Sequence, residues 1–274
     1  KGQRQIRIAI KNQEAPLELS EIFLLDEGPV PSFVQQWQPT VSKADLLLLT
    51  AHPDDEVLFF GGLLPYYGGE LKKNVLPVVM STGTRVRQHE YLNALWECGI
   101  QNYPIMGPFY DKYSSNLKEA YKLWGKNKAH AFVTDLFRQY QPEVVVTHDT
   151  KGEYGHGAHR LCADTVVACI EKAADPSIYE DSAALYGPWQ VKKVYLHLAK
   201  ESPITLNWDE PLFSHGGKTG FQVAQDAYRH HLSQHRYRFE VEPKTSKHSC
   251  YDFGLVFSTV GEDVTKADFL ENIP

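Results

Sequence analysis

The sequence predicts an α/β fold built on a doubly wound, mostly parallel sheet with helices on both faces. Three short, continuous apolar runs carry this prediction: "ADLLLLTA" (44–51), "VLPVVMS" (75–81) and "EVVVTHD" (143–149). Such runs are typical of strands that are buried on both faces of a parallel sheet. Amphipathic segments of helical length separate and follow them, and strands that alternate with helices are joined by right-handed crossovers.

The N-terminal segment has a different pattern. "QIRIAI" (5–10) and "LELSEIFLL" (17–25) each predict a short strand, and a proline-containing connection, "EGPVPSFVQQWQPT" (27–40), follows them. We therefore expect two parts. Residues 1–42 would form a β hairpin or the remnant of a preceding β domain, and residues 43–274 would form the α/β domain.

The remaining elements follow from hydrophobic periodicity. Helices are predicted at 86–98, 128–140 and 157–174, a further strand at 191–198, and a late helix, "GFQVAQDAYRHHLSQH", at 220–235. We interpret the histidine-rich "RHHLSQH" in this last segment as the polar end of an exposed helix, in preference to the wall of a pocket.

Composition limits the classes of partner. The chain has 274 residues and a formal net charge of -6, with no long run of Lys or Arg, which argues against nucleic acid or an anionic membrane as the main partner. No apolar run approaches the roughly 18 residues that a membrane span needs. The absence of G-x-S-x-G and of G-x-G-x-x-G after the first strand argues against a serine hydrolase and a dinucleotide site. Nothing in the sequence indicates the oligomeric state.

The start of the chain bears on its location. It begins at Lys1, without an initiating Met, a basic segment or an apolar leader. We interpret this as a processed or trimmed product whose targeting signal lies out of view. Together with the possible upstream β domain, this favours a secreted or cell-surface location slightly over a cytoplasmic one.

Two loops rich in His and acidic residues follow strands of the predicted sheet. "HPDDE" (52–56) follows the first strand, and "THDTKGEYGHGAHRL" (147–161) ends the third apolar run and continues beyond it. Ligands of doubly wound sheets bind outside the carboxyl ends of the strands, so we expect both loops to open onto one edge. Together the loops offer His52, Asp54, Asp55, His148, Asp149, His156 and His159.

This inventory suits a catalytic metal. A catalytic zinc site uses three protein ligands with N, O or S donors and keeps one position open. His52 and Asp55 can supply two ligands, and the third would be His159 or, as the less favoured alternative, His156. Neighbouring acids on a turn point in different directions, so one of the pair Asp54 and Asp55 would bind the metal and the other could act as general base.

Structural explanations compete with this one. "PDDE" is also a good helix start, because acids in the first turn are favoured by the helix dipole. His156 and His159 could each be a solvated or a core histidine. The arrival of both loops at one sheet edge favours the metal site.

The paired motifs "AHPDDE" and "THDTKGEYGHGAHRL" resemble those of the PIG-L/LmbE-like family of metal-dependent N-deacetylases, and the resemblance runs from about Ala44 to Ser233. It implies a Rossmann-like fold and the removal of acetyl groups from N-acetylglucosamine-type substrates, usually with zinc. It further implies that the metal ligands are His52, Asp55 and His159.

The resemblance also implies roles for other residues. Asp54 would be the general base, and His156 would steady the oxyanion and could protonate the leaving amine. Tyr154 matches a tyrosine that helps to polarise the carbonyl in some relatives. Arg87, in the R-x-x-E helix that includes Glu90, would lie beside the pocket. The similarity also implies that Asp111 contacts sugar hydroxyls.

Two departures from the family pattern stand out. Many relatives have H-P-D-H where this chain has "HGAH" (156–159), and "STGT" (81–84) lacks an acid that is common after the second strand. Neither departure touches the three expected ligands or Asp54. We expect both to affect finer contacts, namely the acid role of His156 and the substrate loop.

The predicted function is therefore that of a metal-dependent hydrolase. Water bound to the metal and activated by Asp54 would attack the acetamide of an N-acetylglucosamine-type sugar or glycoconjugate, and release acetate and a free amine. The metal would be zinc, with ferrous iron or another divalent ion as alternatives. Two other functions stay open: a metal-containing carbohydrate-binding protein without turnover, and an amidase acting on a different amide. The sequence does not specify the sugar or its linkage.

Overall fold

The computed structural model describes residues 22–25, 27–31 and 33–274, and the chain divides into two compact units, Lys1–Gln36 and Trp37–Pro274. The strand predicted at 5–10 and most of the one predicted at 17–25 lie outside the described residues. Residues 22–25 have no regular secondary structure. The division after residue 36 lies near the predicted boundary after residue 42, and the predicted N-terminal β unit stays a prediction.

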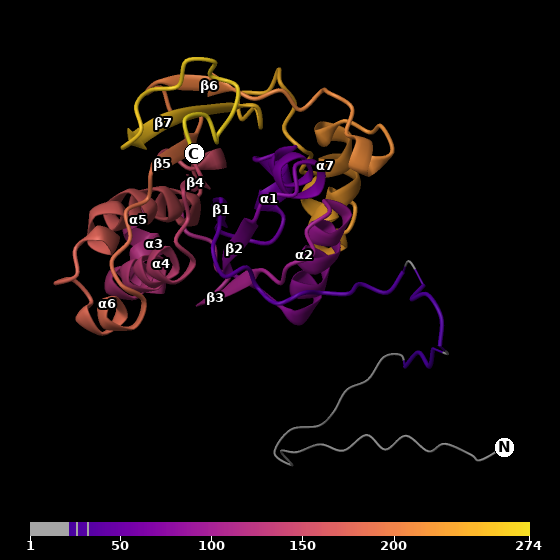
Figure 1. Cartoon of the computed structure of the whole chain (residues 1–274), viewed down its shortest axis with the longest axis horizontal. Helices are drawn as coiled ribbons and strands as arrows, with labels where there is room; N and C mark the ends of the chain where they lie inside the picture. The colour runs from indigo at the N-terminus through magenta and orange to yellow at the C-terminus, as the bar shows by residue number, and fades with distance from the viewer. Residues whose placement is uncertain (1–21, 26, 32) are drawn as a thin grey trace, which may run out of the picture. The chain divides into compact units, whose positions relative to one another are not determined.

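The second unit contains a seven-stranded sheet with the order β3-β2-β1-β4-β5-β7-β6. Its strands are β1 Leu46–Thr50, β2 Val75–Ser81, β3 Ile105–Phe109, β4 Val144–Thr147, β5 Lys193–His197, β6 Pro203–Thr205 and β7 Asp252–Ser258. Strands β1 to β5 pair in parallel, whereas β7 runs antiparallel to both β5 and β6. The predicted mostly parallel α/β class is confirmed (Figure 1).

Seven α-helices, one π-helical segment and three 3-10 segments accompany the sheet in the described part of the chain. The α-helices are α1 Asp55–Leu58, α2 Arg85–Glu97, α3 Leu117–Trp124, α4 Lys126–Tyr140, α5 Gly157–Ala174, α6 Glu180–Tyr186 and α7 Gly220–Tyr228. The π-helical segment is η1 Leu64–Glu70, and the 3-10 segments are η2 Glu153–Gly155, η3 Phe213–His215 and η4 Leu232–Tyr237.

The helix predicted at 220–235 is wrong after Tyr228. The helix α7 ends at Tyr228, because the amides of Arg229, His230 and His231 bond three residues back and tighten the chain. The chain then continues as the separate 3-10 segment η4. Periodicity alone did not distinguish these two pieces from one helix.

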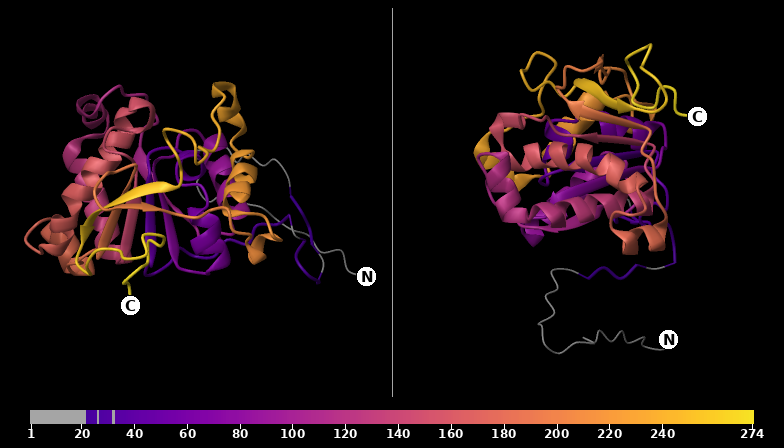
Figure 2. Two further views of the ribbon diagram at one scale, coloured as in Figure 1. Left: turned by 90° about the horizontal axis from the view of Figure 1, so that it is seen from above. Right: turned by 90° about the vertical axis from the view of Figure 1, so that its left-hand side faces the viewer.

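The aliphatic run of β1 is explained by burial on both faces of the sheet. Leu46 and Leu48 point into one core cluster, and Leu47 and Leu49 point into the other. The first core lies under α1, α2 and α7, and the second lies under α3, α4 and α5 (Figures 1 and 2). The helices thus cover both faces of the sheet, as the sequence predicts.

The parallel register places the two motif loops side by side. Leu49 of β1 is in register with Thr147 of β4, so the chain leaves both strands at the same edge. A hydrogen bond from the Thr147 hydroxyl to the Leu49 carbonyl (2.7 Å) joins the two strands at this edge. Within the described residues, no helix has both the length and the apolar character to cross a membrane.

Candidate active site

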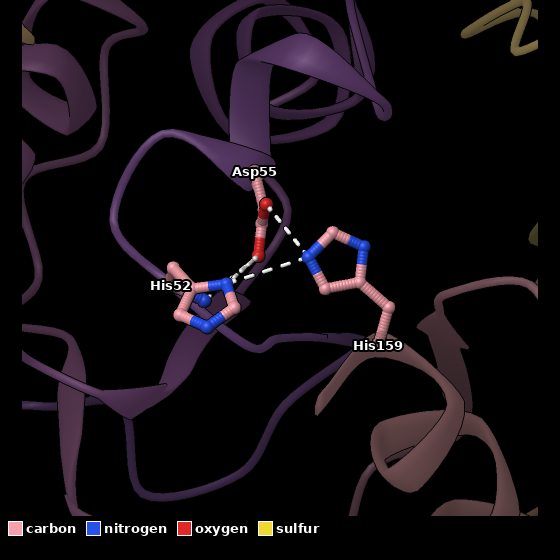
Figure 3. A group of neighbouring side chains, drawn as sticks. All are labelled: His52, Asp55 and His159. Atoms are coloured by element: carbon pink, nitrogen blue, oxygen red, sulfur yellow. Dashed lines mark hydrogen bonds and ion pairs between the residues drawn. The ribbon is translucent and has the colours of Figure 1, made fainter. Parts of the chain in front are cut away.

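Three buried side chains from the two motif loops converge on one point (Figure 3). His52 Nδ1 lies 3.3 Å from Asp55 Oδ2 and 3.3 Å from His159 Nε2, and His159 Nε2 lies 3.4 Å from Asp55 Oδ1. Ligands about 2.1 Å from a tetrahedral zinc stand about 3.4 Å apart, so this spacing fits a shared metal. The donor set of two imidazole nitrogens and a carboxylate is also one that a divalent transition metal accepts.

Local structure positions each of these three groups. His52 follows β1, and its backbone N–H donates to Asp55 Oδ2 (2.7 Å), so the tight turn itself brings the first His and the Asp together. Asp55 opens the short helix α1, and His159 lies in the first turn of α5. His159, and not His156, is therefore the residue of α5 that lies in the cluster with His52 and Asp55.

The electrostatics of the centre favour an ionised Asp55. Burial alone would raise the pKa of Asp55, but His159 and His148 hold that pKa well below its usual range. Burial lowers the pKa of His52. Burial would also lower the pKa of His159, but Asp55 and then Glu153 outweigh it and raise this pKa to about 10. The metal-free site thus holds a proton where a cation would bind.

A buried carboxylate, Glu153, lies behind the centre. It accepts hydrogen bonds from His159 Nδ1 (2.8 Å), His148 Nδ1 (2.9 Å) and His197 Nδ1 (2.5 Å). A proton held on His159 Nδ1 leaves Nε2 free to face a metal, which is the usual role of a carboxylate behind a ligating histidine. The sequence analysis assigned no role to Glu153 or His197. The position of Glu153 inside "GEYGH" was the one available signal.

Two of the predicted candidate residues, His148 and Asp149, lie next to the His52–Asp55–His159 cluster. His148 is fully buried; its Nε2 accepts the Ala51 N–H (3.1 Å) and lies 3.4 Å from Asp55 Oδ2. The Asp149 N–H donates to Glu153 (3.1 Å), and the Asp149 carboxylate accepts from the Lys151 amide. Neither side chain belongs to the His52–Asp55–His159 cluster.

Asp54 is directed differently from Asp55. It is the N-cap residue of α1 by backbone position, yet its side chain makes no capping hydrogen bond. Its Oδ1 lies 3.2 Å from an Arg87 guanidinium nitrogen, and Arg87 also donates to the Pro53 carbonyl and pairs with Asp111. Burial raises the pKa of Asp54 well above its usual range, and Asp55 adds to this, whereas Arg87 opposes it. A carboxyl group of this kind can take up and return a proton.

His156 lies beside the two histidines of the cluster, His52 and His159. Its ring centroid lies 4.7 Å from that of His52 and 4.8 Å from that of His159. Its Nδ1 accepts the Ala158 N–H (3.1 Å), so the neutral ring carries its proton on Nε2. Burial, helped by His52 and His159, lowers the pKa of His156 to about 3. At neutral pH the ring is therefore a hydrogen-bond donor and not a source of a proton.

A cavity of about 830 Å³ opens over these groups. His52, Asp54, Asp55, His156 and His159 line it together with the predicted substrate contacts Tyr154, Arg87 and Asp111. The Tyr154 hydroxyl donates to Glu242, and its ring stacks on Phe239 at 5.5 Å, so in this structure its phenol is engaged away from the centre. Asp111 Oδ1 approaches His52 Nε2 to 3.9 Å.

The opposite wall of the cavity comes from the C-terminal part of the chain. Ser233, Gln234, Arg236 and Tyr237 of η4 line it. Ser233 is tied to α2, because Glu90 accepts both its N–H (2.7 Å) and its hydroxyl (2.6 Å). The interpretation of "RHHLSQH" as an exposed helix end is wrong here, since this segment closes over the site and is not a free helix terminus.

Comparison with known proteins identifies similar chains. Residues 47–170 match the family model PIG-L, described as GlcNAc-PI de-N-acetylase. A protein of Catenulispora acidiphila, named 1D-myo-inositol 2-acetamido-2-deoxy-alpha-D-glucopyranoside deacetylase 1, is 26% identical over 223 residues, which are 71% of this chain and 66% of that protein. A Frankia casuarinae protein of the same name is 26% identical over 213 residues, 65% of this chain and 68% of that one. The match thus covers about two thirds of the length of these relatives.

Solved structures share the fold. N,N'-diacetylchitobiose deacetylase from Pyrococcus horikoshii superposes with a TM-score of 0.55 at 17% identity, over 70% of this chain and 71% of that one. The conserved protein TT1542 from Thermus thermophilus gives a TM-score of 0.51 at 16% identity, over 80% of this chain and 97% of that one. Identities this low support the α/β architecture alone.

Proposed function

We propose that this protein is a metal-dependent N-deacetylase that hydrolyses the acetamide of an N-acetylglucosamine-type sugar or glycoconjugate, and the match of residues 47–170 to the PIG-L family model supports this proposal. One observation carries the proposal. The His52–Asp55–His159 cluster lies in a large cavity beside a second buried carboxylate, Asp54, which caps no helix and is not part of the cluster. A structural turn needs no such second acid.

The metal we propose is zinc, held by His52, Asp55 and His159. A cation in this site supplies Lewis acidity to a water molecule and to the amide carbonyl. Ferrous iron suits the same donor set, and a metal titration decides between the two.

Asp54 supports hydrolysis by moving protons. Its carboxylate, raised in pKa by burial, accepts a proton from the attacking water and returns it to the departing amine. Arg87 holds Asp54 in place from the side, through the 3.2 Å contact. The Nε2–H of His156 is the donor available to the developing oxyanion, where a fixed hydrogen bond stabilises the transition state more than the substrate.

The cavity wall suits a sugar. The paired side chains of Arg87 and Asp111 offer a charged donor and acceptor to ring hydroxyls. Tyr113 and Tyr237, exposed by 70% and 52%, present aromatic surface to the same cavity, where the C–H face of a pyranose can pack. The named substrates of the relatives are also glycosides of an N-acetylated amino sugar.

The test is acetate release from a panel of N-acetylated amino sugars, their short oligomers and glycosides, with zinc-loaded protein. We expect release that disappears after chelation and falls by about 100-fold or more in Asp54→Asn, since general base catalysis contributes about 10²–10⁴-fold. The Asp54→Asn protein should still bind zinc, because Asp54 is not a ligand. Stoichiometric zinc without release from any substrate would overturn the deacetylase proposal, and would favour a carbohydrate-binding protein or an amidase with another substrate.

A further inference from the structure

A buried carboxylate and a buried histidine, Glu56 and His231, bond to each other beside the His52–Asp55–His159 cluster, and neither belongs to that cluster. Glu56 and His231 are both fully buried. Glu56 Oε1 accepts a hydrogen bond from His231 Nε2 (2.7 Å), and Glu56 Oε2 accepts the backbone N–H of Asp54 (2.8 Å). The two oxygens of the Glu56 carboxylate thus join Asp54 to His231, which lies 175 residues after Glu56 in the chain.

The backbone that Glu56 holds is in an unfavourable conformation. Asp54 has φ 118° and ψ -29°, a region that residues with a side chain rarely adopt. Such a conformation persists only where its surroundings enforce it. The helix α1 that follows has only four residues and cannot supply that constraint by itself. The Pro53–Asp54 peptide is held at both ends, because its N–H donates to the Glu56 carboxylate and its carbonyl accepts from Arg87.

We propose that Glu56 and His231 are positioning residues for Asp54. His231 fixes the orientation of the Glu56 carboxylate, and Glu56 in turn holds the Asp54 backbone in the conformation that directs its side chain into the cavity. The inference rests on the proposed function, because it assigns the pair to the general base of that reaction. It extends the working site beyond the two motifs, since His231 lies outside residues 47–170.

The place of His231 in the fold supports a link between the base and the cavity wall. His231 directly precedes η4, whose residues line the cavity, and Ser233 of η4 is bonded to Glu90. The segment that contains His231 and η4 is therefore attached at two points, to α2 through Glu90 and to α1 through Glu56. Within the described residues, His231 Nδ1 is buried without a hydrogen-bond partner. The bond to Glu56 is thus the polar contact that accounts for a histidine here.

A merely structural pair would act on folding alone, so the variants must separate folding from catalysis. His231→Leu removes the donor and keeps similar bulk. His231→Gln keeps an N–H donor near the position of Nε2. His235→Leu is the matched control, because His235 lies on the same segment but bonds the Tyr228 carbonyl (3.2 Å) and not Glu56. Each zinc-loaded protein is assayed for kcat and KM in acetate release, for zinc stoichiometry and for thermal unfolding.

We expect His231→Leu to lower kcat by about 10- to 100-fold, the effect typical of a misplaced catalytic group, with KM and zinc stoichiometry unchanged. His231→Gln should recover most of the lost rate, and His235→Leu should match the wild type. A His231→Leu protein with wild-type kcat overturns the positioning role and leaves the deacetylase proposal intact. Loss of zinc or of folding, without rescue by His231→Gln, also overturns it. A wild-type protein that releases no acetate overturns the proposed function, and the inference with it.

Discussion

At the residue scale, the arrangement of the site depends on Glu153, a group that does not line the cavity. Glu153 accepts three histidine N–H groups in a fully buried position. Burial alone would raise the pKa of its carboxyl, but the charge of His148 and the hydrogen bonds from His148, His159 and His197 hold that pKa well below the usual range. Its negative charge orients His159 and increases the basicity of the nitrogen that faces the metal. Glu153 is therefore as much a part of the site as the ligands.

We predict that Glu153→Gln weakens zinc binding by about 10- to 100-fold, because carboxylates behind ligating histidines carry an effect of that size. The change removes the charge behind His159 and takes one acceptor from the buried cluster. Competition with a chelator of known affinity measures the effect. Glu171→Gln, at an exposed position on α5, is the control and should bind zinc as the wild type does. Equal affinities for the wild type and Glu153→Gln would refute the role of Glu153.

We also predict that zinc binding releases a proton from His159. The pKa of His159 is raised to about 10 without metal, so at pH 7.5 the ring is protonated, and a cation must displace that proton. The affinity for zinc should therefore rise with pH, because a smaller fraction of His159 is protonated as the pH approaches 10. Calorimetric titration at pH 7.5 in buffers of different ionisation enthalpy should show release of at least one proton per zinc. Binding without proton release would contradict a protonated His159 in the free protein.

At the scale of elements, the start of α5 determines where His159 lies. Gly157 is the first residue of this helix, and its N–H donates to the Ser114 carbonyl (2.8 Å). A Cβ at this position would lie 2.4 Å from the backbone oxygen of Asn116. The loop before α3 therefore packs directly against the helix start. A proline at this position would lack the N–H that bonds Ser114 and would clash with the backbone of Asn116.

We predict that Gly157→Ala destabilises the protein by about 1–3 kcal/mol, the usual cost of forcing extra volume into a packed site. Because the clash is with backbone, α5 must shift and carry His159 with it, so zinc affinity should fall as well. Urea denaturation of the metal-free protein measures the first effect, and zinc titration measures the second. An unchanged free energy of unfolding in Gly157→Ala would contradict this prediction, because it would mean that the loop around Asn116 moves aside without loss of stability.

At the scale of the whole second unit, the sheet brings together side chains that the sequence keeps far apart. His52 and His159 are 107 residues apart and meet because β1 and β4 are parallel neighbours that end in register. His197 reaches Glu153 because β5 is the next strand after β4. The residues of the site therefore follow three adjacent strands, β1, β4 and β5, and residues of η4 form another wall of the cavity.

Much of this arrangement was accessible from sequence. The apolar runs of β1, β2 and β4, the main helices and the shared edge of the two loops follow from local hydrophobic patterns and the handedness of parallel crossovers. The structure also places His52, Asp55 and His159 together and Asp54 beside them. The helix end at Tyr228 was missed because hydrophobic periodicity does not separate α7 from the 3-10 segment that follows it. The cavity wall formed by η4 was missed because it depends on contacts with distant elements.

The sequence by itself determined the fold class and the loops that carry the chemistry, since both depend on short-range patterns. Only the tertiary structure decided which buried partners hold those loops: Glu153 behind the ligands, and His231 behind Glu56. The physical reason is that a hydrogen bond between buried side chains depends on how elements pack, and a local pattern carries no record of a partner 44 or 175 residues away. The positive φ of Asp54 is likewise decided by the tertiary structure, because a non-glycine residue adopts such a φ only under constraint from its neighbours.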